Sequence, residues 1–315
     1  MGKKELIFDV IILGAGPAGF SAAIYAARGN IKTALLDISM FGGQPSNYLE
    51  IENYPGFSLI GGFELMEKFE EHVDKFGVEK FPMVEIEKID LNNGLKIIET
   101  TDTIFKAHSI ILATGAQAKK LNIKGEAEFK GRGVSYCAVC DGAFYKEKVV
   151  AVIGGGNAAV EEAMYLTKFA KKVYVIHRRD ELRADKIVQE RAFKNEKLEF
   201  ILSHIPLEIK GNNTVEQIIL QDLKTNESKE LKVDGVFPYI GFSPNIDGFN
   251  GQIKQNQQGF IETDINMQTS VEGVYAIGDV RNTPLRQVIT AAADGAIAAC
   301  SAVHYIEKVK EEIVI

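Results

Sequence analysis

The first apolar positions of the chain form one almost continuous run. Leu6 to Leu13 are aliphatic, aromatic or β-branched except for Asp9, which is typical of a parallel strand buried on both faces. An alanine-rich stretch from Phe20 to Arg28 then predicts a helix, and the apolar run Thr33 to Leu36 predicts a second strand. This order of strand, helix and strand predicts an α/β fold built on a parallel sheet.

A glycine-rich segment joins the first strand to the first helix. It reads Gly14-Ala-Gly16-Pro17-Ala18-Gly19, and Asp37 follows Gly14 by 23 positions (37 − 14), at the end of the second strand. Glycines of this kind allow a tight turn, a close approach to a pyrophosphate and packing of helix on strand, while an acid at that distance accepts a ribose hydroxyl. The segment therefore predicts a dinucleotide site for an adenosine without a 2′-phosphate.

The same pattern occurs a second time. Lys148 to Ile153 and Lys172 to Ile176 predict strands, and Val160 to Phe169 predicts the helix between them. The turn reads Gly154-Gly-Gly156-Asn157-Ala158-Ala159. His177 follows Gly154 by the same 23 positions (177 − 154), so a histidine replaces the ribose-binding acid.

Three arginines follow this histidine: Arg178, Arg179 and Arg183. Loss of the acid removes the acceptor for a ribose hydroxyl, and guanidinium groups suit a 2′-phosphate. The second turn is therefore predicted to bind NADP. The alternative is that the arginines form an ordinary charged, solvated face.

The rest of the chain contains further apolar runs. Short strands are predicted at residues 78–82, 84–90, 95–99, 109–112 and 273–277. The fourth ends in Ala113-Thr114-Gly115, and the fifth is followed by Gly278-Asp279. A helix from Val288 to about Glu307 would begin just after Arg286-Gln287, and a helix N-terminus near a flavin stabilises the negative charge of the reduced ring.

The overall composition is that of an ordinary globular protein. The 315 residues are 46% apolar and 25% charged, and the net charge of −7 disfavours nucleic acid or an anionic membrane as the main partner. Three cysteines are too few for a disulfide framework, which indicates a reducing, cytoplasmic setting. No apolar segment is expected to reach membrane-spanning length, Cys300 is expected to be buried, and the five histidines predict no metal site.

Two of the cysteines stand three positions apart, in Cys137-Ala-Val-Cys140, with Asp141 directly behind them. Cysteines at this spacing on a helical turn can form a disulfide, and unpaired N–H groups at the start of a helix favour the thiolate. Asp141 can take and return the proton of a thiol. The alternative is half of a structural zinc site, but the chain has only Cys300 as a further cysteine.

Taken together, the motifs resemble the low-molecular-weight thioredoxin reductases. Eight segments, in the family's order along nearly the whole chain, carry the resemblance: residues 14–19, 42–45 with 53–56, 113–116, 137–141, 154–159, 177–179 with 183, 278–280 and 286–287. Ala143 stands where some members have an aromatic residue. Another branch of the family takes electrons from ferredoxin and lacks the NADPH motifs, which are present here.

The resemblance implies two Rossmann-like domains of three-layer ββα type, with an NADPH domain inserted into an FAD domain. The FAD domain would comprise residues 1–117 and 246–315, and the NADPH domain, which carries the disulfide, residues 118–245. It also implies a homodimer. The chain crosses between the domains only near 117–119 and 241–245, and we expect these crossings to act as a hinge.

The resemblance also assigns roles to residues. Cys140 would face the flavin, Cys137 would attack the disulfide of thioredoxin, and Asp141 would transfer protons. The predicted FAD-binding residues are Gly14, Gly16, Pro17, Ala18, Gly19, Asp37, Gly43, Gln44, Asn53, Ala113, Thr114, Gly115, Gly278, Asp279, Arg286 and Gln287. The predicted NADPH-binding residues are Gly154, Gly156, Asn157, Ala158, His177, Arg178, Arg179 and Arg183.

The sequence thus predicts a thioredoxin-disulfide reductase that uses NADPH and FAD. One alternative is a reductase of another thioredoxin-like or peroxiredoxin-linked partner, or a flavin NADPH oxidase. A fused thioredoxin-like domain would favour the peroxide systems, whereas this chain begins with the FAD strand. Another alternative is a redox-sensing binding protein, which would not need the NADP arginines.

Overall fold

The chain folds into two compact units. The computed structural model describes residues 3–48, 51, 53–92, 94–249 and 251–314, without the side chains of residues 139, 140, 313 and 314. Unit 1 comprises Met1–Gln117 and Ser243–Ile315, and unit 2 comprises Ala118–Phe242. The α/β class predicted from the sequence is confirmed, because each unit is built around parallel strands.

Unit 1 contains a seven-stranded sheet in the order β3-β2-β1-β6-β5-β4, with β16 also paired to β6. The strands are β1 (Lys4–Leu13), β2 (Thr33–Leu36), β3 (Glu79–Phe81), β4 (Ile86–Asp90), β5 (Lys96–Thr100), β6 (Thr103–Leu112) and β16 (Val274–Ala276). Strands β3, β2, β1, β6 and β16 are parallel, whereas β4 and β5 form an antiparallel meander on β6. Each of the five runs predicted between residues 78 and 277 overlaps one of these strands, although the run 109–112 covers only the last part of β6.

Alternate residues of β1 enter two separate cores. Val10 and Ile12 pack on the face covered by helices, whereas Ile11 and Leu13 pack on the opposite face with the meander. Both faces are therefore apolar, which explains why the sequence shows a continuous run and no alternation.

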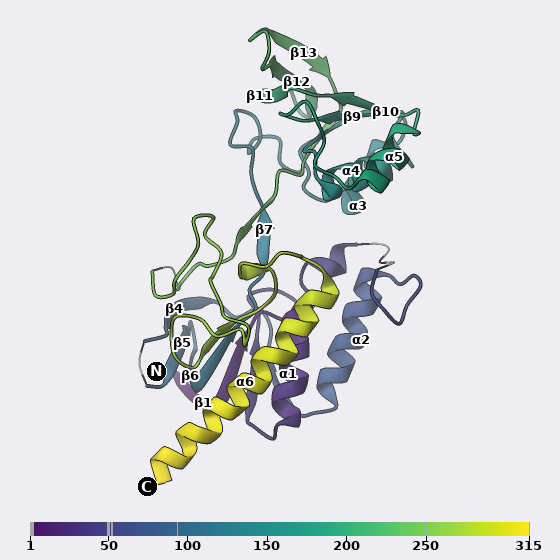
Figure 1. Cartoon of the computed structure of the whole chain (residues 1–315). Helices are drawn as coiled ribbons and strands as arrows, with labels where there is room; N and C mark the ends of the chain where they lie inside the picture. The colour runs from purple at the N-terminus through teal and green to yellow at the C-terminus, as the bar shows by residue number, and fades with distance from the viewer. Residues whose placement is uncertain (1–2, 49–50, 52, 93, 250, 315) are drawn as a thin grey trace. The chain divides into compact units, whose positions relative to one another are not determined.

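Three long helices lie on the same face of the unit 1 sheet (Figure 1). They are α1 (Pro17–Arg28), α2 (Gly62–Asp74) and α6 (Val288–Val314), and two single 3-10 turns accompany them, η1 (Gln44–Asn47) and η3 (Gly278–Val280). Helix α1 packs on α6 and α2. It begins three residues before the predicted Phe20, because proline is accepted in the first turn, where its missing N–H costs no bond.

Helix α6 corrects two expectations. The stretch Val288–Glu312 is long and apolar enough to cross a membrane, whereas the sequence was expected to contain no such segment. Its apolar content is explained by packing, since Ala298, Ala302 and Ile306 are fully buried in the core of unit 1. Cys300 lies off this buried stripe and is exposed, so the expectation that it is buried was wrong.

Unit 2 has three layers. A parallel sheet in the order β10-β9-β8-β14 lies between helices and a three-stranded antiparallel sheet, β11-β12-β13. The strands are β8 (Val149–Ile153), β9 (Lys172–Ile176), β10 (Leu198–Ile201), β11 (His204–Gly211), β12 (Val215–Asp222), β13 (Ser228–Lys232) and β14 (Gly235–Pro238). The helices are α3 (Ala138–Asp141), α4 (Asn157–Leu166) and α5 (Lys186–Phe193), with the 3-10 turn η2 (Gly142–Tyr145).

Residues of β8 again alternate between two cores. Val150 and Val152 pack against α4, whereas Ala151 and Ile153 pack against the antiparallel sheet. The sequence predicted β8, α4 and β9 but none of β10 to β14.

The two crossings of the chain between the units pair with each other. Strand β7 (Ala116–Ala118) and strand β15 (Phe242–Pro244) form a two-stranded sheet. Beside them, the Lys119 N–H donates to the Gly241 carbonyl over 2.9 Å, and the Asn245 N–H donates to the Gly115 carbonyl over 3.0 Å. Backbone hydrogen bonds therefore join the outgoing and the returning segment of the chain at both ends of this two-stranded sheet.

Candidate functional site

The first glycine turn connects β1 to α1 in unit 1. Gly14 has φ of +111°, and a Cβ there would lie 2.2 Å from the Ala113 carbonyl oxygen, so only glycine fits. A Cβ at Gly19 would lie 1.8 Å from the Gly14 carbonyl oxygen. Helix α1 starts after Gly16 with no side-chain cap, which leaves its first N–H groups available to an anion.

Asp37 lies where the spacing predicted, at the end of β2 and against this turn. It is buried, and its Oδ2 accepts the Ala15 N–H over 2.7 Å. Its Oδ1 accepts both the N–H and the hydroxyl of Ser39, each over 2.8 Å. The carboxylate thus holds the turn in place, and its contact with a ribose stays a prediction. No sequence motif indicates this role of Ser39.

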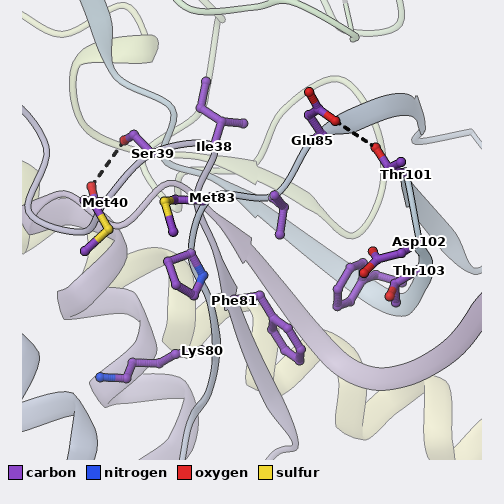
Figure 2. A pocket seen from close by; sticks show the side chains of 13 residues that line it. Ile38, Ser39, Met40, Lys80, Phe81, Met83, Glu85, Thr101, Asp102 and Thr103 are labelled. Carbon is purple, nitrogen blue, oxygen red and sulfur yellow. Dashed lines mark hydrogen bonds between the residues drawn. The ribbon is translucent and has the colours of Figure 1, made fainter.

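A hollow of about 770 Å³ in unit 1 is lined by Ile38 and Ser39, which directly follow Asp37 in the chain (Figure 2). Its apolar wall includes Ile38, Met40 and Met83, each at least 65% exposed. Across from Ile38, the Thr101 hydroxyl donates to the Glu85 carboxylate over 3.1 Å. An open hollow with an apolar wall, next in the chain to the predicted ribose contact, suits a flat base.

Several predicted FAD-binding residues that are far apart in the sequence contact one another or their neighbours. The Gln44 amide donates to the Ala116 carbonyl, and the Asn53 amide donates to Gln287 Oε1 over 2.9 Å. Gly43 has φ of +65°, and a Cβ there would lie 3.0 Å from the Gly16 Cα. The loop after β2 therefore lies directly on the first glycine turn.

Other predicted residues line the same side of unit 1. The Thr114 hydroxyl donates to the Asn245 carbonyl over 2.6 Å, and Gly115 has φ of +68° with open space around it. Gly278 has φ of +67°, and a Cβ there would lie 3.1 Å from the Cβ of Ala18. The turn after β16 is thus packed against the start of α1.

A charged cluster follows this turn. Burial raises the pKa of Asp279, and nearby Arg286 opposes the rise. The Arg286 guanidinium lies 4.3 Å from the centroid of the Phe260 ring, and its buried Nε has no hydrogen-bond partner. Asp294, which the sequence did not single out, binds the Arg281 guanidinium over 3.2 Å and accepts the Gly278 N–H. An unpaired guanidinium nitrogen of this kind is suited to an acceptor on a bound ligand.

The second glycine turn, in unit 2, repeats the geometry of the first. Gly154 has φ of +155°, and a Cβ there would lie 2.3 Å from the Tyr239 carbonyl oxygen. Helix α4 starts after Gly156 without a side-chain cap, and the space around Gly156 is open. Ala158 is exposed, and the Asn157 side chain exchanges two hydrogen bonds with Asp185. The turn and α4 thus provide free N–H groups beside open space.

His177 lies beneath this turn and does not face outward. It is 5% exposed, and a Cβ on Gly155 would lie 2.5 Å from its ring. Burial lowers the pKa of His177, and Arg183, Arg179 and Arg178 lower it further. The ring is therefore neutral near pH 7, and its Nε2 has no hydrogen-bond partner. The three arginines are exposed, and no ion pair of theirs is found among the described residues.

Cys137 directly precedes helix α3 and is disulfide-bonded, so it offers no thiolate to a zinc ion. The side chain of Cys140 lies outside the described residues, and the pairing of the two stays a prediction. Helix α3 is a single turn, closed by the Asp141 N–H donating to the Cys137 carbonyl over 3.2 Å. Over the described part of the chain, no group of three His, Cys, Asp or Glu side chains is placed to hold a metal.

Two of the N–H groups at the start of this helix, which were expected to be unpaired, have side-chain partners. The Cys137 N–H donates to the Ser135 hydroxyl over 3.1 Å, and the Ala138 N–H donates to the Tyr239 hydroxyl over 2.8 Å. Side chains that the motif does not include therefore occupy both donors. Their positions depend on tertiary packing, which the Cys-x-x-Cys spacing does not encode.

Comparisons with known proteins agree with this arrangement. The family described as "Pyridine nucleotide-disulphide oxidoreductase" matches residues 8–295. The chain is 47% identical over 312 residues to a thioredoxin reductase of Bacillus subtilis (strain 168), which covers 99% of this chain and 98% of that protein. The crystal structure of Lactococcus lactis thioredoxin reductase (FR conformation) matches with a TM-score of 0.92 and 45% identity, over 96% of this chain and 99% of that one.

A third relative, a thioredoxin reductase of Peptoclostridium acidaminophilum, is 47% identical over 98% of this chain and 100% of its own length. The resemblance drawn from the sequence motifs is thereby confirmed. The chain belongs to the pyridine nucleotide-disulphide oxidoreductase family and, within it, to the low-molecular-weight thioredoxin reductases.

Proposed function

We propose that this protein is a thioredoxin-disulfide reductase that passes electrons from NADPH through FAD and the Cys137–Cys140 disulfide to thioredoxin. The observation that carries the proposal is the disulfide-bonded Cys137, which lies in the same unit as the second glycine turn. In a reducing compartment such as the cytosol, a disulfide is more often catalytic or redox-sensing than structural. The close relationship to thioredoxin reductases supports the same reaction.

Both cofactors suit the residues that would hold them. The family implies FAD and NAD(P)H. In each unit a glycine turn leads to an uncapped helix N-terminus, which is the geometry that receives a pyrophosphate. Unit 1 adds Asp37 and the unpartnered Arg286 Nε, and would bind FAD.

Unit 2 would bind NADPH. The side chain after β9 is His177, and the three exposed guanidinium groups of Arg178, Arg179 and Arg183 lie close enough to lower its pKa. Their positive charge suits a 2′-phosphate better than a ribose hydroxyl. The open space around Gly156 leaves room for the pyrophosphate.

The chemistry of the disulfide follows from its residues. Bound FAD would accept a hydride from NADPH and supply two electrons. Those electrons break the Cys137–Cys140 bond, and the two sulfurs take up two protons, with Asp141 as the nearest acid in the sequence. The Cys137 thiolate then attacks the disulfide of thioredoxin, and Cys140 displaces the reduced thioredoxin from the mixed disulfide. The disulfide of the enzyme is thereby restored.

We also propose a homodimer and a cytoplasmic location. Unit 1 exposes apolar side chains that a second copy could cover, including Phe63 at 61% and Leu59 at 56% exposure. Sedimentation equilibrium tests the dimer, and a single species with the mass of one chain would contradict it. Cell fractionation with an antibody tests the location.

Replacement of Cys140 by serine tests the proposed reaction. We expect NADPH to reduce the bound flavin of the Cys140→Ser variant at an unchanged rate, whereas reduction of thioredoxin falls to the background level. Both steps are measured by absorbance under anaerobic conditions. The matched control is Cys300→Ser, since Cys300 is free and in the other unit. Thioredoxin reduction that survives Cys140→Ser would refute the assigned role.

A further inference from the structure

Helix α3 is too short to be stable by itself. It has four residues, and a single turn fixes several backbone angles for only one hydrogen bond. Its position therefore depends on contacts from elsewhere in unit 2. Two tyrosine hydroxyls, those of Tyr239 and Tyr136, supply such contacts on either side of Cys137.

Tyr239 connects the helix to the returning crossing. Its hydroxyl accepts the Ala138 N–H over 2.8 Å, and Ala138 is fully buried. The Tyr239 N–H donates to the Ile153 carbonyl over 2.7 Å, and its own carbonyl lies against Gly154. Tyr239 is also two positions before Gly241, which has φ of +115° and begins the returning crossing. One residue thus touches the disulfide helix, the second glycine turn and the crossing.

Tyr136 connects the same helix to the outgoing crossing through Glu126. The Tyr136 hydroxyl donates to Glu126 Oε1 over 2.7 Å, and Glu126 is only 3% exposed. The Glu126 carboxylate also accepts the N–H groups of Leu121 and Asn122, each over 2.7 Å. These two residues follow Lys119, whose N–H donates to Gly241. Burial and Glu126 raise the pKa of Tyr136, so the hydroxyl keeps the proton that it donates.

We propose that the hydroxyls of Tyr239 and Tyr136 are positioning groups that hold the disulfide helix against the two segments leading to the crossings, and thereby set the rate of the disulfide step. The inference rests on the proposed function of Cys137 and Cys140. It extends that function to residues outside the Cys-x-x-Cys motif. A reacting sulfur must be held close to its productive position, and small displacements cost large factors in rate.

The two hydroxyls differ in what their loss leaves behind. In Tyr239→Phe, the buried Ala138 N–H loses its partner, which costs more than the bond itself. In Tyr136→Phe, the Glu126 carboxylate keeps two backbone donors and stays satisfied. We therefore expect Tyr239→Phe to have the larger effect.

The experiment compares the flavoprotein as purified with Tyr239→Phe, Tyr136→Phe and the double variant. We expect kcat with thioredoxin to fall about tenfold in Tyr239→Phe and about fivefold in Tyr136→Phe. The rate of anaerobic flavin reduction by NADPH is expected to stay within about twofold, since that step does not use the disulfide. Tyr174→Phe is the matched control, because Tyr174 is half-buried on β9 in the same unit.

Three results would overturn the inference. The first is an unchanged kcat with thioredoxin in the double variant. The second is a lowered melting temperature with kcat intact, which would mean that the hydroxyls only stabilise the fold. The third is an equal fall in flavin reduction and in thioredoxin turnover. In all three cases the Cys140→Ser result is unaffected, so the proposed function is judged separately.

Discussion

The free energy of unfolding is expected to depend on pH through Glu162, and the size of this effect can be calculated from the shift in its pKa. Glu162 lies on α4, is partly buried, and its Oε2 has no hydrogen-bond partner. Burial, with a smaller effect from Glu161, raises the pKa of Glu162 from its ordinary value of 4.5 to about 7. Between these two values the folded protein holds a proton that the unfolded chain has released. The free energy of unfolding therefore falls as the pH rises through this window.

The size of the effect follows from the two pKa values. A difference of 2.5 pH units (7 − 4.5) at 1.36 kcal/mol each gives a full loss of about 3 kcal/mol above pH 7. Part of this loss is already present at pH 5, so the change between pH 5 and pH 8 is about 2 kcal/mol. Glu162→Gln removes the titrating group, and the variant is expected to lose this part of the pH dependence.

Urea unfolding followed by circular dichroism at pH 5 and pH 8 measures the effect. Relative to the wild type, Glu162→Gln should gain stability at pH 8 by about 2 kcal/mol more than at pH 5. Glu190→Gln is the matched control, since it makes the same change at an exposed position on α5 and Glu190 does not contribute to the pKa shift of Glu162. If the wild type and Glu162→Gln lose equal stability between the two pH values, then Glu162 is already ionised in the folded protein and the reasoning is wrong.

Two further predictions concern the glycine turns and the arginines. Arg178→Ala with Arg179→Ala should lower kcat/KM for NADPH about 100-fold and leave that for NADH within about threefold, because two charge-assisted hydrogen bonds to the phosphate are lost; an unchanged preference would contradict the 2′-phosphate assignment. Gly14→Ala should give protein with at most about a tenth of the flavin of the wild type, because the new Cβ meets the Ala113 carbonyl at a strained φ. Gly156→Ala, with open space around it, is the control, and flavin absorbance per chain measures both.

The sequence predicted the elements whose hydrophobic pattern is local. Strands such as β1 and β8 are buried on both faces and appear as continuous apolar runs, and glycine turns at fixed spacing mark the helices after them. The antiparallel sheet of β11 to β13 was missed, because charged residues alternate along its exposed face and its pairing depends on distant segments.

At the site, the direction of a side chain was harder to predict from the sequence than the position of its backbone. His177 occupies the position that spacing assigns to a cofactor contact, yet its ring is packed under Gly155. The bond from Ala138 to Tyr239 joins residues 101 positions apart and has no sequence motif. Spacing along a strand and turn fixes where a Cα lies, whereas the direction of the side chain depends on the space that packing leaves.

Asp37 and His177 occupy the same position relative to the two glycine turns, 23 residues after the first glycine, but they differ in charge and in contacts. In the first, Asp37 accepts the Ala15 N–H, so a negative charge lies at the turn. In the second, the His177 ring lies under Gly155, and burial, with a further effect from the surrounding arginines, lowers the pKa of His177 so that its ring stays neutral. A neutral imidazole adds no charge for a phosphate. Selection of a 2′-phosphate would therefore fall to the arginines alone, whose charge does not change over the pH range in which enzymes work.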